Sequence, residues 1–252
     1  MKLKIKDLEF FFKKIFFSDS YLLKKRIVRA INKNYEKELF FINQFEDKTK
    51  VALDIGVYRG VYSYKLSKFF KHVHSFEPNP LLFPYLDKNL KKIIRNINLY
   101  NLALSDKSGE TILKLPLRSG SIFRDNIEEL YQLGAASIHP DNEFNESKKV
   151  KVKMERLDNI HIKNIGFIKI DVEGHELEVI KGAKETIIKN KPVLLVEIEK
   201  RHSKRSVEET INFINNLGYE CFFTNEKNLI PISKLDDKSF ENNFFFLPSN
   251  LY

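Results

Sequence analysis

From residue 50 onward, short apolar runs rich in Val and Ile alternate with stretches of helical periodicity. The run at 51–55 is followed by a helical pattern near 61–70, and the run at 165–170 by another near 176–189. Strands that alternate with helices are typical of βαβ units, whose strands pair in parallel and bury both faces. The pattern therefore predicts an α/β fold with a doubly wound, mostly parallel sheet.

The same reasoning assigns the remaining elements. Pro80 suits the first turn of a helix, and Gly218 ends another. The stretch 116–148 is the least regular, and a loop of that length inside a compact domain is usually functional or mobile. Further strands are predicted at 73–76, 97–103, 111–115, 149–154 and 193–198, with helices at 80–94 and 207–217 and a terminal antiparallel pair at 219–224 and 243–247.

The composition excludes several classes of protein. Of the 252 residues, 42% are hydrophobic and 22 are Phe, which is enough for a buried core and excludes wholesale disorder. Cys221 has no second cysteine to pair with, and no apolar run reaches the ~18–20 residues that span a bilayer. Lys13 and Lys14 interrupt the Phe-rich start, which makes it a poor signal peptide. We therefore expect a reduced, cytoplasmic protein.

The net charge of +9 is concentrated near the N-terminus. Residues 1–50 contain thirteen Lys and Arg against seven Asp and Glu, a net +6. Apolar positions at helical spacing predict one helix over 3–16 and a second over 22–35. We expect residues 1–48 to form a basic, Phe-rich helical extension and residues 49–252 to form the main domain. Such an extension either packs its apolar face on the domain or contacts an anionic membrane.

The first strand of the main domain leads into a glycine turn. Asp54 lies near its end, and Gly56 and Gly60 bracket the turn into the next helix. Glycine is needed where the backbone turns sharply or approaches a ligand closely. Glu77 ends the next strand, 21 residues after Gly56, at the edge of the sheet where open α/β folds bind ligands. That spacing suits a carboxylate that accepts hydrogen bonds from both hydroxyls of a ribose.

The residues of this turn distinguish between cofactors. A dinucleotide site prefers Gly-x-Gly-x-x-Gly, which places pyrophosphate at a helix N-terminus. Here the turn is Asp-x-Gly-x-x-x-Gly, with Tyr58 where a middle glycine would stand. The carboxylate of Asp54 repels phosphate and attracts an ammonium or a sulfonium, which favours S-adenosylmethionine. Ser105 and Asp106, after the third strand, either contact the adenine edge of the cofactor or form a simple turn.

Several motifs between residues 50 and 200 belong together. They are Leu53-Asp54-Ile55-Gly56, Ser75-Phe76-Glu77-Pro78-Asn79-Pro80, Ala103-Leu104-Ser105-Asp106, Arg156-Leu157-Asp158 and, most specific, Ile168-Lys169-Ile170-Asp171-Val172-Glu173-Gly174-His175-Glu176. With them the sequence resembles the FkbM family of class I methyltransferases. The resemblance implies a seven-stranded sheet, S-adenosylmethionine as methyl donor, and a hydroxyl of a sugar or another natural product as acceptor.

The resemblance and the turn chemistry together give a set of expected cofactor contacts. One position departs from the family pattern, because Val57-Tyr58 stands where Ala-Asn is common. Tyr58 is therefore expected to contact the methionine part of the cofactor through its backbone. The expected cofactor-binding residues are Asp54, Gly56, Tyr58, Gly60, Glu77, Ser105, Asp106 and Asp171.

The block from Asp171 to Glu176 supplies the expected catalytic groups. Methyl transfer requires an aligned acceptor oxygen and a group that takes its proton, and a general base contributes typically ~10²–10⁴-fold. His175 is the first candidate for this base, because an imidazole titrates near pH ~6.5. Asp171 is the second if burial raises its pKa, and Glu173 is expected to face the same opening. The alternative is structural: His175 caps the next helix and Glu173 stabilises its N-terminus.

The acceptor is expected to bind at the rim of this opening. Glu173, Glu197 after the next strand, His202 and Ser137 are the expected substrate-binding residues. No tight ligand spacing demands a metal ion, so we expect none. We predict an O-methyltransferase acting on a sugar or glycoconjugate hydroxyl, for example of a surface polysaccharide precursor.

The alternatives concern the acceptor and the partners. A nucleic-acid-binding methyltransferase is suggested by the net charge, and a methyltransferase of a non-sugar natural product also stays open. The sequence has no base-methylation motif, zinc ligands or aromatic RNA-binding signature, so we expect no specific nucleic-acid partner. The expected partner is a small-molecule or glycan substrate. A peripheral contact with an anionic membrane and a homodimer are left open.

Overall fold

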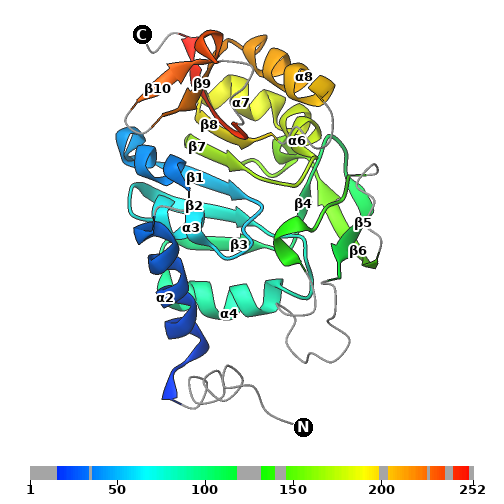
Figure 1. Ribbon diagram of the computed structural model, residues 1–252. Helices are drawn as coiled ribbons and strands as arrows, with labels where there is room; N and C mark the ends of the chain where they lie inside the picture. Colours follow the sequence, from blue (N-terminus) through cyan, green and yellow to red (C-terminus); the bar gives the residue numbers. More distant parts are fainter. Residues whose placement is uncertain are drawn as a thin grey trace.

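The computed structural model describes residues 16–33, 36–117, 132–139, 146–198, 204–225, 228–235 and 241–249 (Figure 1). The described strands form a large sheet in the order β10-β9-β11-β8-β7-β1-β2-β3. These strands are β1 (Asp47–Ile55), β2 (Phe70–Phe76), β3 (Ile97–Tyr100), β7 (Ile165–Ile170), β8 (Val193–Glu197), β9 (Tyr219–Thr224), β10 (Leu229–Pro231) and β11 (Asn243–Pro248).

The pairing of the strands confirms the predicted doubly wound, mostly parallel sheet. β3, β2, β1, β7 and β8 pair in parallel with their neighbours. β11 is antiparallel to both β8 and β9, which confirms the predicted terminal pair. The short β10 is one strand more than the seven that were expected, and it pairs with the outer edge of β9.

A second, three-stranded sheet lies beside the carboxyl ends of β1, β2 and β3 (Figure 1). The prediction of one strand over 97–103 was wrong, because the chain leaves the large sheet after β3 and enters the small one. The side-chain amide of Asn101 donates to the backbone oxygens of Glu77 and Pro78, at 2.8 and 3.0 Å, and fixes the chain where it turns away. The strands of the small sheet are β4 (Ala103–Leu104), β5 (Gly109–Pro116) and β6 (Ser147–Glu155).

Helical segments cover both faces of the large sheet. One face carries α2 (Asp19–Asn32), the 3-10 segment η1 (Lys37–Phe45), α3 (Val61–Leu66) and α4 (Phe83–Ile93), and the other carries α6 (Glu176–Gly182), α7 (Lys184–Asn190) and α8 (Lys204–Asn215). Short 3-10 turns are η2 (Leu133–Ala135), η3 (Leu157–Asn159) and η5 (Ile232–Lys234).

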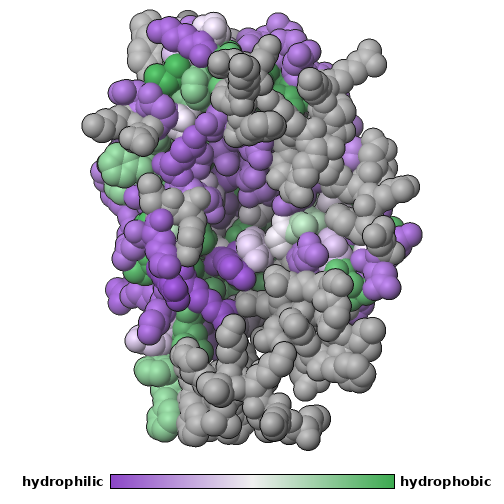
Figure 2. Space-filling view, viewed as in Figure 1, coloured by the Kyte–Doolittle hydropathy of each residue, from purple (hydrophilic) through white to green (hydrophobic). Residues whose placement is uncertain are grey.

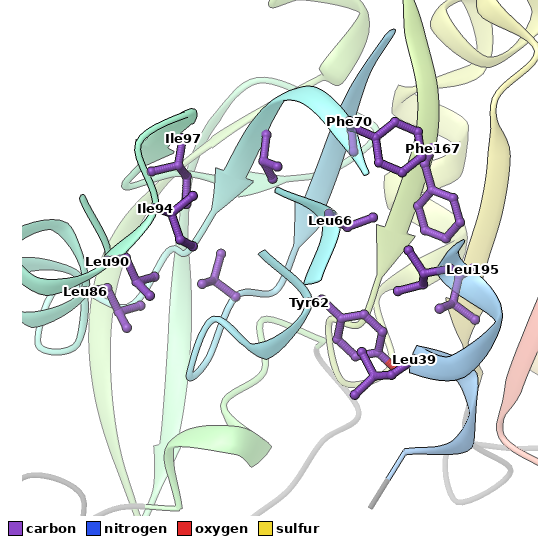
Figure 3. Close-up of a cluster of buried hydrophobic side chains, with 14 of the residues drawn as sticks. Leu39, Tyr62, Leu66, Phe70, Leu86, Leu90, Ile94, Ile97, Phe167 and Leu195 are labelled. Carbon is purple, nitrogen blue, oxygen red and sulfur yellow. The ribbon is translucent and has the colours of Figure 1, made fainter. Parts of the chain in front are cut away.

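Neighbouring residues of each strand belong to different cores, because successive side chains point to opposite faces of the sheet. Phe167 packs in the core under α3 and η1, and the adjacent Ile168 packs in the core under α6 and α8. Figure 3 shows part of the first core, where Leu39 lies beside Tyr62 and Phe167 lies beside Phe70. Burying side chains of this size stabilises the fold by about 1.5–3 kcal/mol each.

Two predicted helices differ in length from the observed ones. The helix predicted over 61–70 ends at Leu66, because the chain must enter β2 at Phe70. The helix predicted over 176–189 is broken between α6 and α7. The break follows Gly182, whose backbone lies so close to the small sheet that a Cβ there would be 1.8 Å from the carbonyl oxygen of Ser105.

The N-terminal segment packs onto the main domain. Ser18 caps α2, since its Oγ accepts a hydrogen bond from the N–H of Tyr21 at 3.3 Å. Segment η1 adds Phe41, whose ring centroid lies 6.1 Å from that of Phe245 in β11. The predicted division at residue 48 falls within β1, and η1 shares a core with the sheet. The helix predicted over 3–16 lies outside the described residues except at its last position.

No described helix has both the length and the apolar character needed to cross a membrane.

Candidate active site

A pocket lies at the carboxyl ends of β1, β2 and β7. The chain passes from β1 to β2 and β3 on one side and later to β7 and β8 on the other, so the winding direction changes between β1 and β7. Such switch points are where open α/β sheets bind ligands. The pocket holds about 650 Å³ of empty space, part of it open to solvent, and is closed on its far side by residues of the small sheet and η2.

Gly56 brings two strand ends into close contact at the floor of the pocket. Its φ is +89°, and a Cβ in its place would lie 1.7 Å from the carbonyl oxygen of Asp171. The N–H of Gly56 donates to the carbonyl oxygen of Phe76 at 3.0 Å, and the N–H of Asp171 donates to that of Ile55 at 2.9 Å. The ends of β1, β2 and β7 are therefore fixed relative to one another only while residue 56 has no side chain.

The Gly56→Ala variant is expected to lower the free energy of unfolding by roughly 1–3 kcal/mol more than Gly109→Ala does. Both glycines have positive φ, +89° and +137°, so both variants have backbone strain in common. Only at Gly56 does the added methyl group overlap backbone atoms, because no atom lies within 4 Å of a Cβ at Gly109. Urea unfolding of the two variants measures the difference, and equal losses would contradict the overlap.

Glu77 lines the pocket at the end of β2. Its Oε2 accepts a hydrogen bond from the N–H of Tyr58 at 3.1 Å, and its Oε1 accepts one from the N–H of Asn79 at 3.0 Å. Burial raises the pKa of Glu77 to about 7, although both of these hydrogen bonds favour the carboxylate. Two backbone donors therefore fix the carboxyl group, and each oxygen keeps a lone pair for a ligand hydroxyl.

Tyr58 forms part of the pocket wall and has an unusual backbone. Its φ is +47°, which is uncommon for a residue with a side chain and aims its N–H at Glu77. Its ring lies against η2, where a Cβ on Gly134 would be 3.2 Å from the ring. In this structure the backbone N–H of Tyr58 therefore binds Glu77, and the expected contact with the cofactor stays a prediction.

Asp54 lies beneath the pocket and is not part of its lining. It is fully buried, its Oδ2 accepts a hydrogen bond from the hydroxyl of Ser63, and that hydroxyl lies 2.9 Å from the hydroxyl of Ser75. Its Oδ1 has no hydrogen-bond partner among the described residues. Burial raises the pKa of Asp54 to about 7. Gly60 lies at the start of α3, where a Cβ would be 2.7 Å from the side chain of Leu90, so it serves helix packing.

Asp171 and Glu197 meet beside a buried lysine at the end of β7. Lys169 Nζ lies 3.6 Å from Asp171 Oδ2 and 3.8 Å from Glu197 Oε2. Lys169 is fully buried, and its ammonium lies 4.9 Å from the ring centroid of Tyr62. Burial alone would lower the pKa of Lys169, but the surrounding carboxyl groups, Asp171 first among them, together raise it above its ordinary value. Burial and the nearby Asp171 raise the pKa of Glu197 to about 8, whereas Lys169 lowers it.

Lys169 is the residue of this site to which the sequence reasoning gave no role. The feature that could have indicated a role for it is its charge, because this lysine stands between Ile168 and Ile170 in a strand whose other residues are apolar. A buried ammonium needs a charged partner, and the nearest carboxylate in the sequence is Asp171, two residues later on the same face of the strand. The structure adds Glu197, which the sequence places far away.

The turn after β7 is held in an unusual conformation. Glu173 has a φ of +53° and Gly174 a φ of +95°. Glu176 Oε1 accepts hydrogen bonds from the N–H of Gly174 at 2.9 Å and of Val172 at 3.3 Å, and burial raises its pKa to about 7. Ser137 also holds the turn, because its hydroxyl donates to the carbonyl oxygen of Glu173 at 2.7 Å. Glu173 lines the pocket, whereas Ser137 lies behind it.

The structure does not bring His175 into the pocket. His175 is buried, and its Nε2 lies 2.9 Å from the hydroxyl of Ser105, which in turn donates to Asp106 Oδ1 at 3.1 Å. Burial lowers the pKa of His175 below its ordinary value, so the ring is neutral at physiological pH. The adjacent Ala103 and Leu104 line the pocket, but Ser105 and Asp106 face His175. The Ser105–His175 contact thus joins the small sheet to the start of α6.

Two expectations, on His202 and on the metal ion, stay predictions. His202 lies outside the described residues. Within the described ranges no group of three His, Cys, Asp or Glu side chains is arranged for a metal ion, and the metal-free expectation stays a prediction.

The pocket fits S-adenosylmethionine better than a phosphate-bearing cofactor. Glu77 is placed for the ribose hydroxyls, and the apolar Phe76 and Leu104 suit the faces of an adenine ring. Asp171 and Glu173 line the pocket and bring negative charge that suits a sulfonium and would repel a pyrophosphate.

The sequence is similar to known methyltransferases. The family model described as "Methyltransferase FkbM domain" matches residues 54–221. The chain is 26% identical over 156 residues to the methyltransferase sdnD of Sordaria araneosa, covering 53% of this chain and 60% of that protein. A solved FkbM methyltransferase from Methylobacillus flagellatus KT is 16% identical, with a TM-score of 0.49, over 78% of this chain and 43% of that one.

A Streptococcus mutans protein in complex with SAH is also similar, at 12% identity and a TM-score of 0.45, over 83% of this chain and 93% of that one. The match covers less than two thirds of the length of the Sordaria and Methylobacillus proteins.

Proposed function

Because this chain belongs to the FkbM methyltransferase family, we propose that it is an O-methyltransferase that methylates a hydroxyl of a sugar or glycoconjugate. S-adenosylmethionine is the cofactor of the family, and it supplies a methyl group already activated as a sulfonium substituent. The observation that carries the proposal is the placement of Glu77 and Asp171 in one pocket, at the ends of β2 and β7.

Glu77 and Asp171 have different tasks in this proposal. Glu77, held by the N–H groups of Tyr58 and Asn79, binds the ribose and fixes the nucleoside end of the cofactor. Asp171 takes the proton of the acceptor hydroxyl, because its side chain is 32% exposed and borders the pocket. The ammonium of Lys169 lies 3.6 Å from Asp171 Oδ2, so a positive charge stands beside the proposed proton acceptor.

The rim of the pocket supports a hydroxyl-rich acceptor. Asp171 and Glu173 line the opening, and Glu197 adjoins it. Carboxylates accept hydrogen bonds from several hydroxyl groups of a sugar at once, and they repel the phosphates of a nucleic-acid strand.

The binding of SAH, the demethylated cofactor, is expected to weaken by about tenfold when the pH is lowered from 8 to 6. Burial raises the pKa of Glu77 to about 7 in the free protein, so the carboxylate predominates at pH 8 and the carboxylic acid at pH 6. Ribose hydroxyls donate to the carboxylate, so binding favours the deprotonated form. Calorimetry at both pH values measures the change, and the Glu77→Gln variant should show weak binding with little dependence on pH. An unchanged affinity in the wild type would count against Glu77 as the ribose ligand.

A screen for release of SAH tests the acceptor class. Nucleotide sugars, oligosaccharides, non-sugar alcohols and phenols, and RNA are each incubated with the protein and S-adenosylmethionine. Turnover with a sugar or oligosaccharide, with the methyl group found on oxygen, is the expected result. Turnover confined to RNA or to non-sugar compounds would contradict the proposed acceptor.

A further inference from the structure

Three helices on one face of the sheet carry the positive charge of the chain. Residues 19–33, 61–71 and 83–95 contain α2, α3 and α4 and hold twelve Lys and Arg and two Asp, a net +10. The whole chain has +9, so all other residues together carry −1. Eleven of the twelve cationic side chains are exposed, and Lys65 is half-buried. Residues 19–33 contribute +4 to this sum, and the segments of the main domain that contain α3 and α4 contribute +6.

The three helices form one continuous surface. α2 packs against both α3 and α4, with Leu23 and Ile27 buried beneath it. In Figure 2 hydrophilic side chains cover the position of α2. A surface with this many cations and few acidic groups generates a positive potential that attracts polyanions.

Exposed aromatic side chains adjoin the cations at the start of α2. The exposed fractions are 72% for Phe16, 45% for Phe17 and 48% for Tyr21. The rings of Phe17 and Tyr21 are stacked, with centroids 4.9 Å apart. Figure 2 shows hydrophobic residues next to hydrophilic ones at the lower left, where α2 begins. The methyltransferase pocket uses none of these rings.

We propose that the face formed by α2, α3 and α4 binds the surface of an anionic lipid bilayer. Phe16, Phe17 and Tyr21 enter the headgroup layer, and the Lys and Arg side chains contact lipid phosphates. Peripheral binding of this kind needs an apolar and a basic signal together, and this surface has both. Single-stranded nucleic acids instead occupy grooves lined with aromatic rings, whereas these cations lie on the outer sides of packed helices. The proposal does not depend on methyl transfer.

Sedimentation with vesicles tests the proposal on the full chain. The protein is expected to bind vesicles of phosphatidylcholine mixed with phosphatidylglycerol and not vesicles of phosphatidylcholine alone. High salt should release it, because the attraction is screened beyond a few ångströms.

A charge-reversal variant on this face should bind much more weakly. The variant combines Lys24→Glu, Lys25→Glu, Lys88→Glu and Lys92→Glu, all at exposed positions of α2 and α4. Its partition coefficient onto anionic vesicles is expected to fall at least about 30-fold. The cations of residues 1–15 are unchanged in this variant, so the loss reports on the helical face.

A matched variant separates the effect of this face from that of net charge. It combines Lys149→Glu, Lys163→Glu, Lys184→Glu and Lys189→Glu, which are exposed and lie outside the three helices. It has the same net charge as the first variant, and its partition coefficient onto anionic vesicles is expected to fall less than about threefold.

A third variant tests the aromatic side chains at the start of α2. Phe17→Ser combined with Tyr21→Ser should weaken binding about tenfold while leaving the net charge unchanged.

Equal binding of the two charge variants would overturn the proposal. Absence of binding to anionic vesicles would overturn it as well, and tight binding of an RNA oligonucleotide by the same protein would then assign the face to nucleic acid.

Discussion

The Asp171→Asn variant is expected to lower kcat for methyl transfer by about 10²–10⁴-fold. Asp171 follows β7, borders the pocket and has the ammonium of Lys169 3.6 Å from its Oδ2. Asn has nearly the same shape and cannot take a proton from the acceptor hydroxyl. Steady-state kinetics with the acceptor found by the screen measures kcat, and calorimetry should show that SAH affinity changes by no more than about threefold.

His175→Gln is the matched comparison, because His175 is the base expected from the sequence. Its ring is buried and contacts the hydroxyl of Ser105, so this variant is expected to lower kcat by less than about tenfold. Its main effect should be on the stability of the contact between the small sheet and α6. If His175→Gln abolished turnover in a folded protein while Asp171→Asn did not, the assignment of the base would be reversed.

Lys169→Met is expected to move the acid limb of the pH–rate profile upward by about 1–3 pH units. Met has a similar length and no charge. The lysine lowers the pKa of Glu197 in the wild type, although burial and Asp171 together raise it to about 8. Without the ammonium, the pKa of Glu197 rises further, so the limb of the profile that follows the ionisation of Glu197 moves to higher pH.

The measurement is kcat between pH 6 and pH 9 for Lys169→Met and for Lys65→Met. Lys65 lies on α3, is half-buried and has its ammonium 5.3 Å from the ring centroid of Phe69. Among the described residues, no carboxylate forms an ion pair with Lys65. Lys65→Met should leave the profile unchanged. An acid limb that stays in place in Lys169→Met would show that the ammonium does not set the charge of the carboxyl pair.

Residues at the ends of strands could be predicted from the sequence. Gly56, Glu77 and Asp171 each follow an apolar run, and parallel strands place their carboxyl ends at one edge of the sheet. Strand register is thus enough to bring these three residues together. The hydrogen bond from the Tyr58 N–H to Glu77 could not be predicted, because it depends on the φ of +47° at Tyr58.

The orientation of residues in the turn after β7 could not be predicted. Spacing alone put Glu173 and His175 in the same opening, but the positive φ angles of Glu173 and Gly174 separate them. Glu173 remains at the pocket, and His175 turns toward Ser105. Backbone angles of this kind are set by contacts from distant segments, such as the hydroxyl of Ser137 on the Glu173 carbonyl oxygen.

The most direct test of the account is calorimetric titration of the wild-type protein with SAH. The pocket at the ends of β1, β2 and β7, with Glu77 held by two backbone N–H groups, predicts saturable binding of one equivalent. Absence of heat and of any thermal shift at millimolar SAH would contradict the account.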